Sequence, residues 1–276
     1  MRYKKQLGRA LIYLFCIAGT FIALFPIYWM LINAFKPSTE ILKYPPTFLP
    51  ETWTFQNFVT VWQKAMWPQF FFNSIFVTLS VVFGCMLFSS MAAYAFARIE
   101  FPAKNLIFML FLSSMMIPAV VILIPQFVIM KNFGMLNSYW ALILPFFFGN
   151  AFSIFFMRNF FLSVPEPISQ AAEIDGCGHL RIFAQIYLPL SKHALLTLGL
   201  LRAVQVWNDF MWPLIVVNSE NLRTVPLAIS TIFYTNRSVD WAGLMTASCI
   251  GLVPLLLLFL LAKDYLMESI GATGFK

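Results

Sequence analysis

The sequence predicts an all-α integral membrane protein with six transmembrane helices. Of its 276 residues, 61% are hydrophobic and only 11% are charged, whereas a soluble domain carries about 25% charged residues. Whole windows of about 20 residues, the length that crosses a bilayer core, are nearly free of charge. Apolar runs such as LVPLLLLFLLA at 252–262 lack the strict alternation that is typical of a membrane-spanning β-barrel.

The six expected spans are each long enough to cross the bilayer as a helix. Only helices and closed barrels satisfy every backbone polar group in lipid, so a helix is the expected form of each span. The segments between the spans are rich in proline, glycine, asparagine and charge, which is typical of loops. The expected spans cover approximately residues 10–35, 69–96, 105–130, 139–161, 194–217 and 243–262.

The first span follows a basic start, MRYKK, which is similar to that of a secretory signal peptide. Its apolar run is too long for a signal peptide and no small-residue cleavage site follows it, so we expect a retained span. The next segment, 37–68, is rich in proline and aromatic residues and is expected to lie along the outer interface. We therefore divide the chain into residues 1-68, a five-helix core at 69-265 and a tail at 266-276.

Basic residues indicate the orientation in the membrane. With both termini on one side, that side holds eleven Lys and Arg residues and the other side holds six, with Arg202 inside a span. Because cytoplasmic loops carry the excess of Lys and Arg, both termini are expected in the cytoplasm. The same bias explains the net charge of +7, so we infer no nucleic-acid partner and expect membrane lipid around the spans.

A polar, glycine-broken loop at 163-193 joins the fourth and fifth spans. Ser163 and Glu166 have the spacing of a capping box, with a proline in the first turn, which predicts the start of a helix. The helix is expected to run to about Ile174. Gly176 then suits the left-handed position that ends a helix.

A second short amphipathic helix is expected after this glycine and is expected to break at Pro189. Its apolar residues recur at three- and four-residue spacing: Leu180, Phe183 and Ile186. In the first helix, Ala171 and Ala172 give a face with almost no side chain, and Glu173 and Asp175 supply negative charge beside it. This surface suits a groove in another protein; the alternative is an ordinary amphipathic loop at the membrane surface.

The order of residues in this loop resembles the cytoplasmic "EAA" loop in the membrane subunits of ATP-binding cassette importers. The similar positions are Gln170-Ala171-Ala172, Asp175-Gly176, Phe183, Ile186 and Leu188-Pro189-Leu190. The resemblance implies a coupling helix that seats in a cleft of an ATPase subunit through Gln170, Ala171, Ala172, Glu173, Asp175 and Gly176. The family's usual Glu is Gln170 here, which puts one ion pair with the ATPase in doubt, and His193 replaces a proline that often follows.

The resemblance extends over nearly the whole chain. Segments 73–98, 133–148 and 207–229 and the closing GATGFK are similar to the six-span, maltose-type membrane subunits of carbohydrate importers. It implies the type-I ABC importer permease fold in the plasma membrane of a prokaryote. It also implies three kinds of partner: a second, homologous permease subunit, two ATPase subunits and an extracytoplasmic solute-binding protein that delivers the sugar.

Three further groups of residues are candidates for function. Trp207, Asn208 and Asp209 lie inside the fifth span, where a carboxylate is costly unless it faces a cavity or a partner. They are expected to line the translocation pathway; the alternative is a structural pairing of Asp209 with Arg202. The resemblance implies that the loop 218–242 contacts the binding protein, through Glu220, Arg223 and Arg237, and that the tail enters the ATPase dimer, through Gly271, Gly274 and Lys276. The alternative for both segments is disorder.

No enzyme chemistry is expected in this chain. It lacks the glycine-rich phosphate loop with its Lys-Ser/Thr, so ATP and Mg are expected on the partner ATPase subunits and no cofactor on this one. His179 and His193 have no cysteine or carboxylate at metal-ligand spacing, so we expect no metal site. The sequence thus predicts the permease subunit of a binding-protein-dependent sugar importer, and the resemblance implies an oligosaccharide as the substrate. The alternative is a stand-alone secondary transporter or a membrane sensor.

Overall fold

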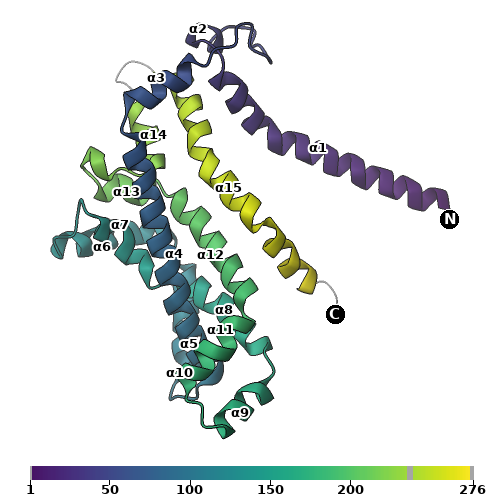
Figure 1. Cartoon of the computed structure of the whole chain (residues 1–276), viewed down its shortest axis with the longest axis vertical. Coiled ribbons are helices and arrows are strands. Elements are labelled where there is room, and N and C mark those ends of the chain that lie inside the picture. The colour runs from purple at the N-terminus through teal and green to yellow at the C-terminus, as the bar shows by residue number, and fades with distance from the viewer. Residues whose placement is uncertain (1, 235–238, 274–276) are drawn as a thin grey trace. The chain divides into compact units, whose positions relative to one another are not determined.

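The computed structural model describes residues 2–234 and 239–273, and helices dominate both ranges (Figure 1). Besides the helices, these ranges contain one isolated bridge, between Tyr234 and Val239. The predicted all-α class is therefore confirmed. The chain forms two compact units, one of residues 1–67 and 228–253 and the other of residues 68–227 and 254–276. The three-part division made from the sequence stays a prediction.

The first unit begins with a long apolar helix, α1 (Arg2–Ala34), and continues with α2 (Ser38–Ile41) and α3 (Gln56–Lys64). Most of α14 (Val225–Ile232) and the first part of α15 (Trp241–Thr273) belong to this unit as well. Two hydrogen bonds from Asn57, to the carbonyls of Ala34 and Lys36 at 2.9 and 2.8 Å, hold the start of α3 against the end of α1.

A buried charged pair folds the segment after α1. The Lys36 ammonium is 1% exposed; it donates to the Thr47 carbonyl and lies 5.0 Å from the centre of the Trp29 ring. Glu40 is 7% exposed and accepts hydrogen bonds from the Thr47 hydroxyl at 2.7 Å and from the Glu51 amide at 3.0 Å. Burial raises the pKa of Glu40, but these hydrogen bonds and the charge of Lys36 outweigh it, so the pKa is lowered.

The second unit holds the remaining helices. The longest is α4 (Trp67–Arg98), which begins at the boundary between the units. The others, in chain order, are α5 (Lys104–Ser113), η1 (Ser114–Met116), α6 (Ala119–Asn132), α7 (Tyr139–Phe147), α8 (Ala151–Ser163), α9 (Glu166–Ile174), α10 (His179–Ile182), the π-helix η2 (Phe183–Tyr187), α11 (Leu188–Leu190), α12 (Lys192–Trp207), α13 (Met211–Val216) and η3 (Glu220–Leu222).

Four helical segments within the described residues are long and apolar enough to cross a membrane: Leu11–Ala34, Trp67–Arg98, Tyr139–Ser163 and Trp241–Lys263. A fifth is added if the bent pair Lys104–Met116 and Ala119–Asn132 counts as one span. These segments support a multi-pass membrane protein. The count of six stays a prediction.

Three of the predicted spans are not single straight helices. The span expected at 105–130 bends by 104° at Ile117, whose backbone is extended, because the following Pro118 disfavours a helical conformation in the residue before it. The span expected at 194–217 ends its first helix at Trp207 and starts again at Met211. The span expected at 139–161 stops at Phe147 and starts again at Ala151. The expectation of one unbroken helix was wrong in all three places.

The core of the second unit has two clusters. One joins the end of α4 to α8 and η2 and includes Tyr94, Met157, Phe161 and Tyr187. Arg98 ties these elements together, because its guanidinium donates to the carbonyls of Phe161 and Val164 at the end of α8 and lies 5.5 Å from the Tyr187 ring. A cation suits the negative end of a helix dipole, so this arginine anchors α8 where the chain turns into α9.

The other cluster joins α4, α7 and α13, around Val81, Ala141 and Trp212. The Trp212 indole donates to the Ala141 carbonyl at 2.8 Å, and its ring lies 6.3 Å from that of Phe146 in an edge-to-face contact. Hence α7 and α13 pack as a fixed pair at the end of the unit remote from α9.

Candidate functional site

The helix α9 occupies the position predicted for the docking helix. It begins at Glu166 and ends at Ile174, as expected, but the predicted capping box is wrong. Ser163 is the last residue of α8, and its hydroxyl donates to the Phe160 carbonyl at 2.7 Å. Instead, α9 starts with Pro165 at its N-cap and Pro167 in its first turn, where the fixed φ of proline suits a helix and no donor is lost.

The end of α9 is a Schellman motif. Gly176 has φ +80°, the left-handed conformation predicted for it. Its amide donates to the Glu173 carbonyl at 3.0 Å, and the Cys177 amide donates to the Ala172 carbonyl at 2.9 Å, which is the hydrogen-bond pair that defines this motif. Ala172 and Cys177 also pack against the same core cluster. The chain therefore leaves α9 in one fixed direction.

The two alanines of α9 have different surroundings. Ala172 is partly buried against the core cluster, next to Ser169, whose hydroxyl is buried and lies 3.4 Å from the Tyr187 hydroxyl. Ala171, by contrast, is exposed, as are the predicted contact residues Gln170, Glu173, Asp175 and Gly176. Only Ala171 of the pair therefore belongs to the outward surface.

The outward surface of this loop is apolar as well as anionic. Ile174 is 86% exposed and Leu180 is 76% exposed, which is high for large aliphatic side chains in a region that precedes a membrane span. The exposed Glu173, whose carboxylate lies 4.0 Å from the His179 ring, adds an anionic group to the same loop. A surface of this composition is typical of a protein interface rather than of a free loop.

The chain after α9 forms one nearly continuous helical rod. The predicted break at Pro189 is wrong, because this proline lies early in α11 and the π-helical turn before it accommodates the missing donor. Ser191 separates α11 from α12, yet its amide donates to the Tyr187 carbonyl at 3.0 Å and its carbonyl accepts from Leu195 at 2.9 Å. The rod therefore runs from His179 to Trp207.

The predicted pathway residues lie together where this rod ends. Trp207 is buried, with its ring 6.4 Å from that of Phe71. Asn208 is exposed, and its amide nitrogen donates to the Val204 carbonyl at 2.9 Å. Asp209 accepts from the Trp212 amide at 3.3 Å, which caps the start of α13. Of the three side chains, Asn208 is the one that is open to its surroundings.

Arg202 and Asp209 form no ion pair with each other among the described residues. The Arg202 guanidinium is buried and donates to the Gln205 side chain at 2.5 Å, one turn along α12. The structural alternative of a direct Arg202–Asp209 pairing therefore finds no support here.

The predicted binding-protein loop is fixed at its beginning. Glu220 and Arg223 lie together, with 3.6 Å between their charged groups. Asn73 of α4 donates to the carbonyls of Asn221 and Arg223, both at 2.8 Å, and accepts from the Tyr139 hydroxyl at 2.6 Å. Asn73 was not among the predicted site residues. One indication of its role was present in the sequence, a single asparagine near the start of an apolar span.

A second asparagine fixes the same loop from another side. The Asn137 side chain accepts from the amides of Asn218 and Ser219 at 3.0 and 2.9 Å and donates to the Ser219 hydroxyl at 2.6 Å. Sequence reasoning missed this residue too. Of the other predicted contacts, Gly271 belongs to α15, while Arg237, Gly274 and Lys276 lie outside the described residues.

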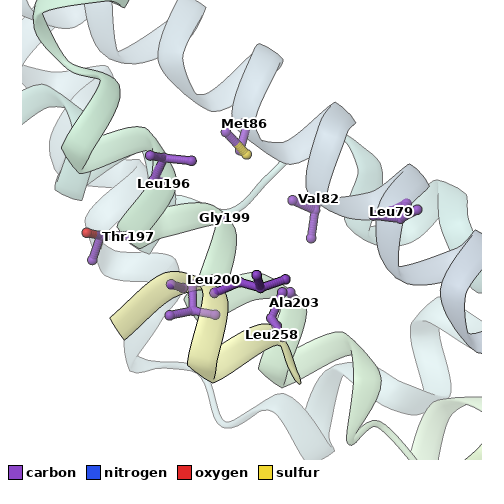
Figure 2. Close-up of a pocket in the computed structure, with 11 residues that line it drawn as sticks. Leu79, Val82, Met86, Leu196, Thr197, Gly199, Leu200, Ala203 and Leu258 are labelled. Carbon is purple, nitrogen blue, oxygen red and sulfur yellow. The ribbon is translucent and has the colours of Figure 1, made fainter. Parts of the chain in front are cut away.

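An apolar cavity of about 310 Å³ lies between α4, α12 and the later part of α15 (Figure 2). It is lined by Leu79, Val82, Met86, Leu196, Thr197, Gly199, Leu200, Ala203, Leu258, Leu261 and Ala262. Thr197 supplies the one side-chain hydroxyl in this set, so the cavity offers little to the hydroxyl groups of a sugar. In the described part of the chain, no group of three His, Cys, Asp or Glu residues could hold a metal ion.

Comparison with known proteins assigns the chain to a family. Residues 85–270 match the family model described as "Binding-protein-dependent transport system inner membrane component". A probable ABC transporter permease protein of Bacillus subtilis (strain 168) is 34% identical over 276 residues, which cover 100% of this chain and 91% of the relative. An arabinooligosaccharides transport system permease protein of Halalkalibacterium halodurans is 33% identical over 259 residues, which cover 93% of this chain and 92% of the relative.

A solved structure has the same fold. A chain from the crystal structure of a bacterial ABC transporter involved in the import of the acidic polysaccharide alginate matches with a TM-score of 0.83 at 23% identity. The match covers 96% of this chain and 98% of that chain. The likeness confirms the predicted importer-type permease fold.

Proposed function

Because this chain belongs to the family of binding-protein-dependent transport system inner membrane components, we propose that it forms half of the translocation pathway of an ATP-driven sugar importer. The chain is the membrane permease subunit, a transport component. The substrate is an oligosaccharide, as the name of the arabinooligosaccharide relative suggests. The observation that carries the proposal is the outward surface of α9, which is apolar, anionic and rigidly held.

The exposed side of α9 is the docking surface for an ATPase subunit. Ala171 allows close approach, while Ile174 and Leu180 supply apolar area and Glu173 a negative charge. Two ATPase subunits bind ATP and Mg, a second, homologous permease completes the pathway, and a solute-binding protein delivers the sugar. The description of the matching family supports the binding protein. The ATPase subunits and the second permease follow from the resemblance of the loop to the coupling helix of importers.

The orientation follows from the charge distribution. The excess of Lys and Arg on the side of the α9 loop supports cytoplasmic termini and a cytoplasmic docking surface. The opposite side then carries Glu220 and Arg223, where the binding protein docks. The protein thus resides in the plasma membrane of a prokaryote, with the ATPase and the binding protein on opposite faces.

The mechanism is alternating access driven by a population shift. When ATP closes the ATPase dimer, the docked α9 moves with it as a rigid element, because the Schellman motif and the Ser169–Tyr187 contact fix its direction. The helical rod from His179 to Trp207 carries this motion to the pathway residues. ATP and the loaded binding protein each favour the outward-open state, and hydrolysis restores the inward-open one.

Reconstitution tests the proposal. The chain is purified together with its partner permease and ATPase subunits, whose genes can lie next to its own or elsewhere in the genome. The complex is placed in vesicles with the binding protein and assayed for ATP turnover with arabinooligosaccharides. Sugar-loaded binding protein should raise turnover, and sugar should accumulate in the vesicles only with ATP. Uptake by the chain without any ATPase subunit, driven by an ion gradient, would show a secondary transporter instead.

A further inference from the structure

Two helical segments of the second unit are interrupted within their length. The segment Tyr139–Ser163 is interrupted at Phe148–Asn150, between α7 and α8, and the segment from Lys192 to Val216 is interrupted at Asn208–Phe210, between α12 and α13. Each break contains an asparagine with an exposed side chain, Asn150 in one and Asn208 in the other. Asn208 is among the predicted pathway residues, whereas Asn150 is not, and neither break was predicted from the sequence.

The packing of the helices brings the two breaks to the same level. Before the first break, α7 packs against α13, and after it, α8 packs against α12 (Figure 1). Since α13 follows the second break and α12 precedes it, the two broken segments run antiparallel with their breaks adjacent. The Trp212–Ala141 hydrogen bond fixes one side of the breaks, and the packing of Leu198 and Ala194 in a cluster with Met157 fixes the other.

The first break lies at mid-depth of its span. Tyr139–Ser163 has 25 residues, and Asn150 is the twelfth of them. At 1.5 Å per residue this places Asn150 about 17 Å along the helix, close to the middle of a hydrocarbon core about 30 Å thick. Irregular backbone at this depth is tolerated only where it is buried in protein or lines a water-filled cavity.

Specific side-chain contacts stabilise both breaks. Asn150 caps α8, because its side-chain oxygen accepts from the Ser153 amide at 2.9 Å and from the Ser153 hydroxyl at 2.8 Å. Gly149 has φ +84°, and a Cβ atom there would lie 1.9 Å from the Ser89 hydroxyl oxygen, so α4 approaches the break too closely for any other residue. At the second break Asp209, the residue before the N-cap position of α13, accepts from the Trp212 amide in the first turn of that helix.

The two asparagines leave complementary groups open. The side-chain oxygen of Asn150 serves the cap, and its amide nitrogen has no acceptor among the described residues. For Asn208 the reverse holds, since the amide nitrogen donates to Val204 while the amide oxygen receives no hydrogen bond from the described part of the chain. One exposed donor and one exposed acceptor therefore lie at adjacent breaks, at a depth where unsatisfied polar groups are costly.

We propose that Asn150 and Asn208 form a hydroxyl-binding pair on the translocation pathway, with Asn150 donating to a sugar hydroxyl and Asn208 accepting from one. A sugar hydroxyl both donates and accepts, so it suits this pair in a way that a lipid chain does not. The assignment rests on the proposed transport of a sugar. It adds Asn150 and the first helix break to the pathway and gives Asp209 the role of capping α13 rather than of touching sugar.

Thiol labelling in the reconstituted complex tests the placement. Asn150→Cys and Asn208→Cys are made in a chain whose exposed Cys16 and half-buried Cys177 are serine; the remaining Cys85 and Cys249 are buried. A charged, water-soluble methanethiosulfonate should label both new cysteines, at rates that differ between the ATP-free and the vanadate-trapped complex. Phe155→Cys, on an exposed apolar position one turn further along α8, is the control for lipid exposure and should stay unlabelled.

Sugar protection and a capping-neutral variant complete the test. Sugar present during turnover, with arabinooligosaccharides tested first, should slow labelling at both cysteines. Asn150→Gly keeps a residue that is tolerated at an N-cap but removes every side-chain donor, so sugar uptake should fall about three- to tenfold with ATPase assembly unchanged. Ser153→Ala weakens the same cap without removing the open donor and should leave uptake within about twofold of wild type.

The outcomes separate the two proposals. If neither cysteine is labelled in any nucleotide state, the breaks face protein or lipid and the pair is overturned. If both are labelled but a transported sugar gives no protection, or if Asn150→Gly transports at the wild-type rate, the sugar contact is overturned. A wild-type complex in which no sugar raises ATP turnover would instead refute the proposed function, whatever the labelling shows.

Discussion

Neighbouring alanines in α9 allow a matched test of the docking surface. Ala171 is exposed, whereas Ala172 is partly buried against the core cluster that contains Tyr94 and Tyr187. The same replacement, alanine to leucine, therefore adds the same three carbons toward a partner in one case and toward this chain's own core in the other. Leucine has nearly the helix propensity of alanine, so α9 itself should persist in both variants.

The expected magnitudes differ because the surroundings differ. Ala171→Leu changes an exposed position and should alter the free energy of unfolding of the free chain by less than about 0.5 kcal/mol. Ala172→Leu adds side-chain volume to a packed contact beside Ser169, which should cost about 1–3 kcal/mol. The effect on ATPase docking has the opposite order, since Ala171→Leu has the larger effect there. Its side chain holds the ATPase surface away from α9 and should abolish sugar-driven ATP turnover.

Two measurements separate these effects. The thermal midpoint of the detergent-purified chain reports folding, and co-purification with the ATPase subunit reports docking. Ala171→Leu should keep the wild-type midpoint and lose the ATPase, whereas Ala172→Leu should lower the midpoint. A complex that carries Ala171→Leu and still transports sugar at the wild-type rate would refute the docking surface, and an unchanged midpoint for Ala172→Leu would refute the inward placement of this alanine.

Three further predictions follow from other contacts of the described residues. Gly176→Ala should lower the stability of the α9 loop by about 1–2 kcal/mol, because φ +80° is strained for a Cβ-bearing residue; Gly176→Asn should cost less, and equal proteolysis of all three chains would contradict this. Asn137→Ala should weaken the 218–219 turn by about 1–3 kcal/mol and raise its protease sensitivity, while basal ATP turnover survives; protection equal to wild type would contradict the role of its side chain. The pKa of Glu40 is lowered from 4.5, so the stabilisation that ionised Glu40 provides is full above pH 4.5 and is lost as the pH falls through the folded-state pKa. Glu40→Gln should therefore flatten the fall of the thermal midpoint below about pH 4.5. An unchanged pH profile would count against the Lys36–Glu40 cluster.

Sequence reasoning succeeded where one local rule decides the structure. The charge-free windows identified the membrane class, since no soluble fold accommodates them. The end of α9 was predicted at Ile174 with Gly176 left-handed, because a glycine after an amphipathic run leaves few alternatives. The order of residues in the loop identified the family, which the family match confirms.

The helix breaks show where such reasoning fails. A hydropathy window averages over about 20 residues, so it cannot register two or three residues at which a helix stops and is capped again. Asn150 and Asp209 each cap a new helix inside an apolar run, and their effect depends on a close approach of α4 at Gly149 that no local pattern reports. The start of α9 failed for a related reason, because α8 extends through Ser163 and leaves the capping role to Pro165.

If α9 is the docking helix that we propose, the arrangement of α9, the rod and the breaks accounts for its action on the proposed pathway. Hydrogen bonding continues through Ser191, so the rod has no free hinge between His179 and Trp207. The rod ends at Asn208, where the chain is irregular and φ and ψ can change without breaking a helical ladder. A rigid rod transmits a displacement to the first point at which it can yield. A motion imposed on α9 is therefore expressed at the two adjacent breaks, which is where the open polar groups of Asn150 and Asn208 lie.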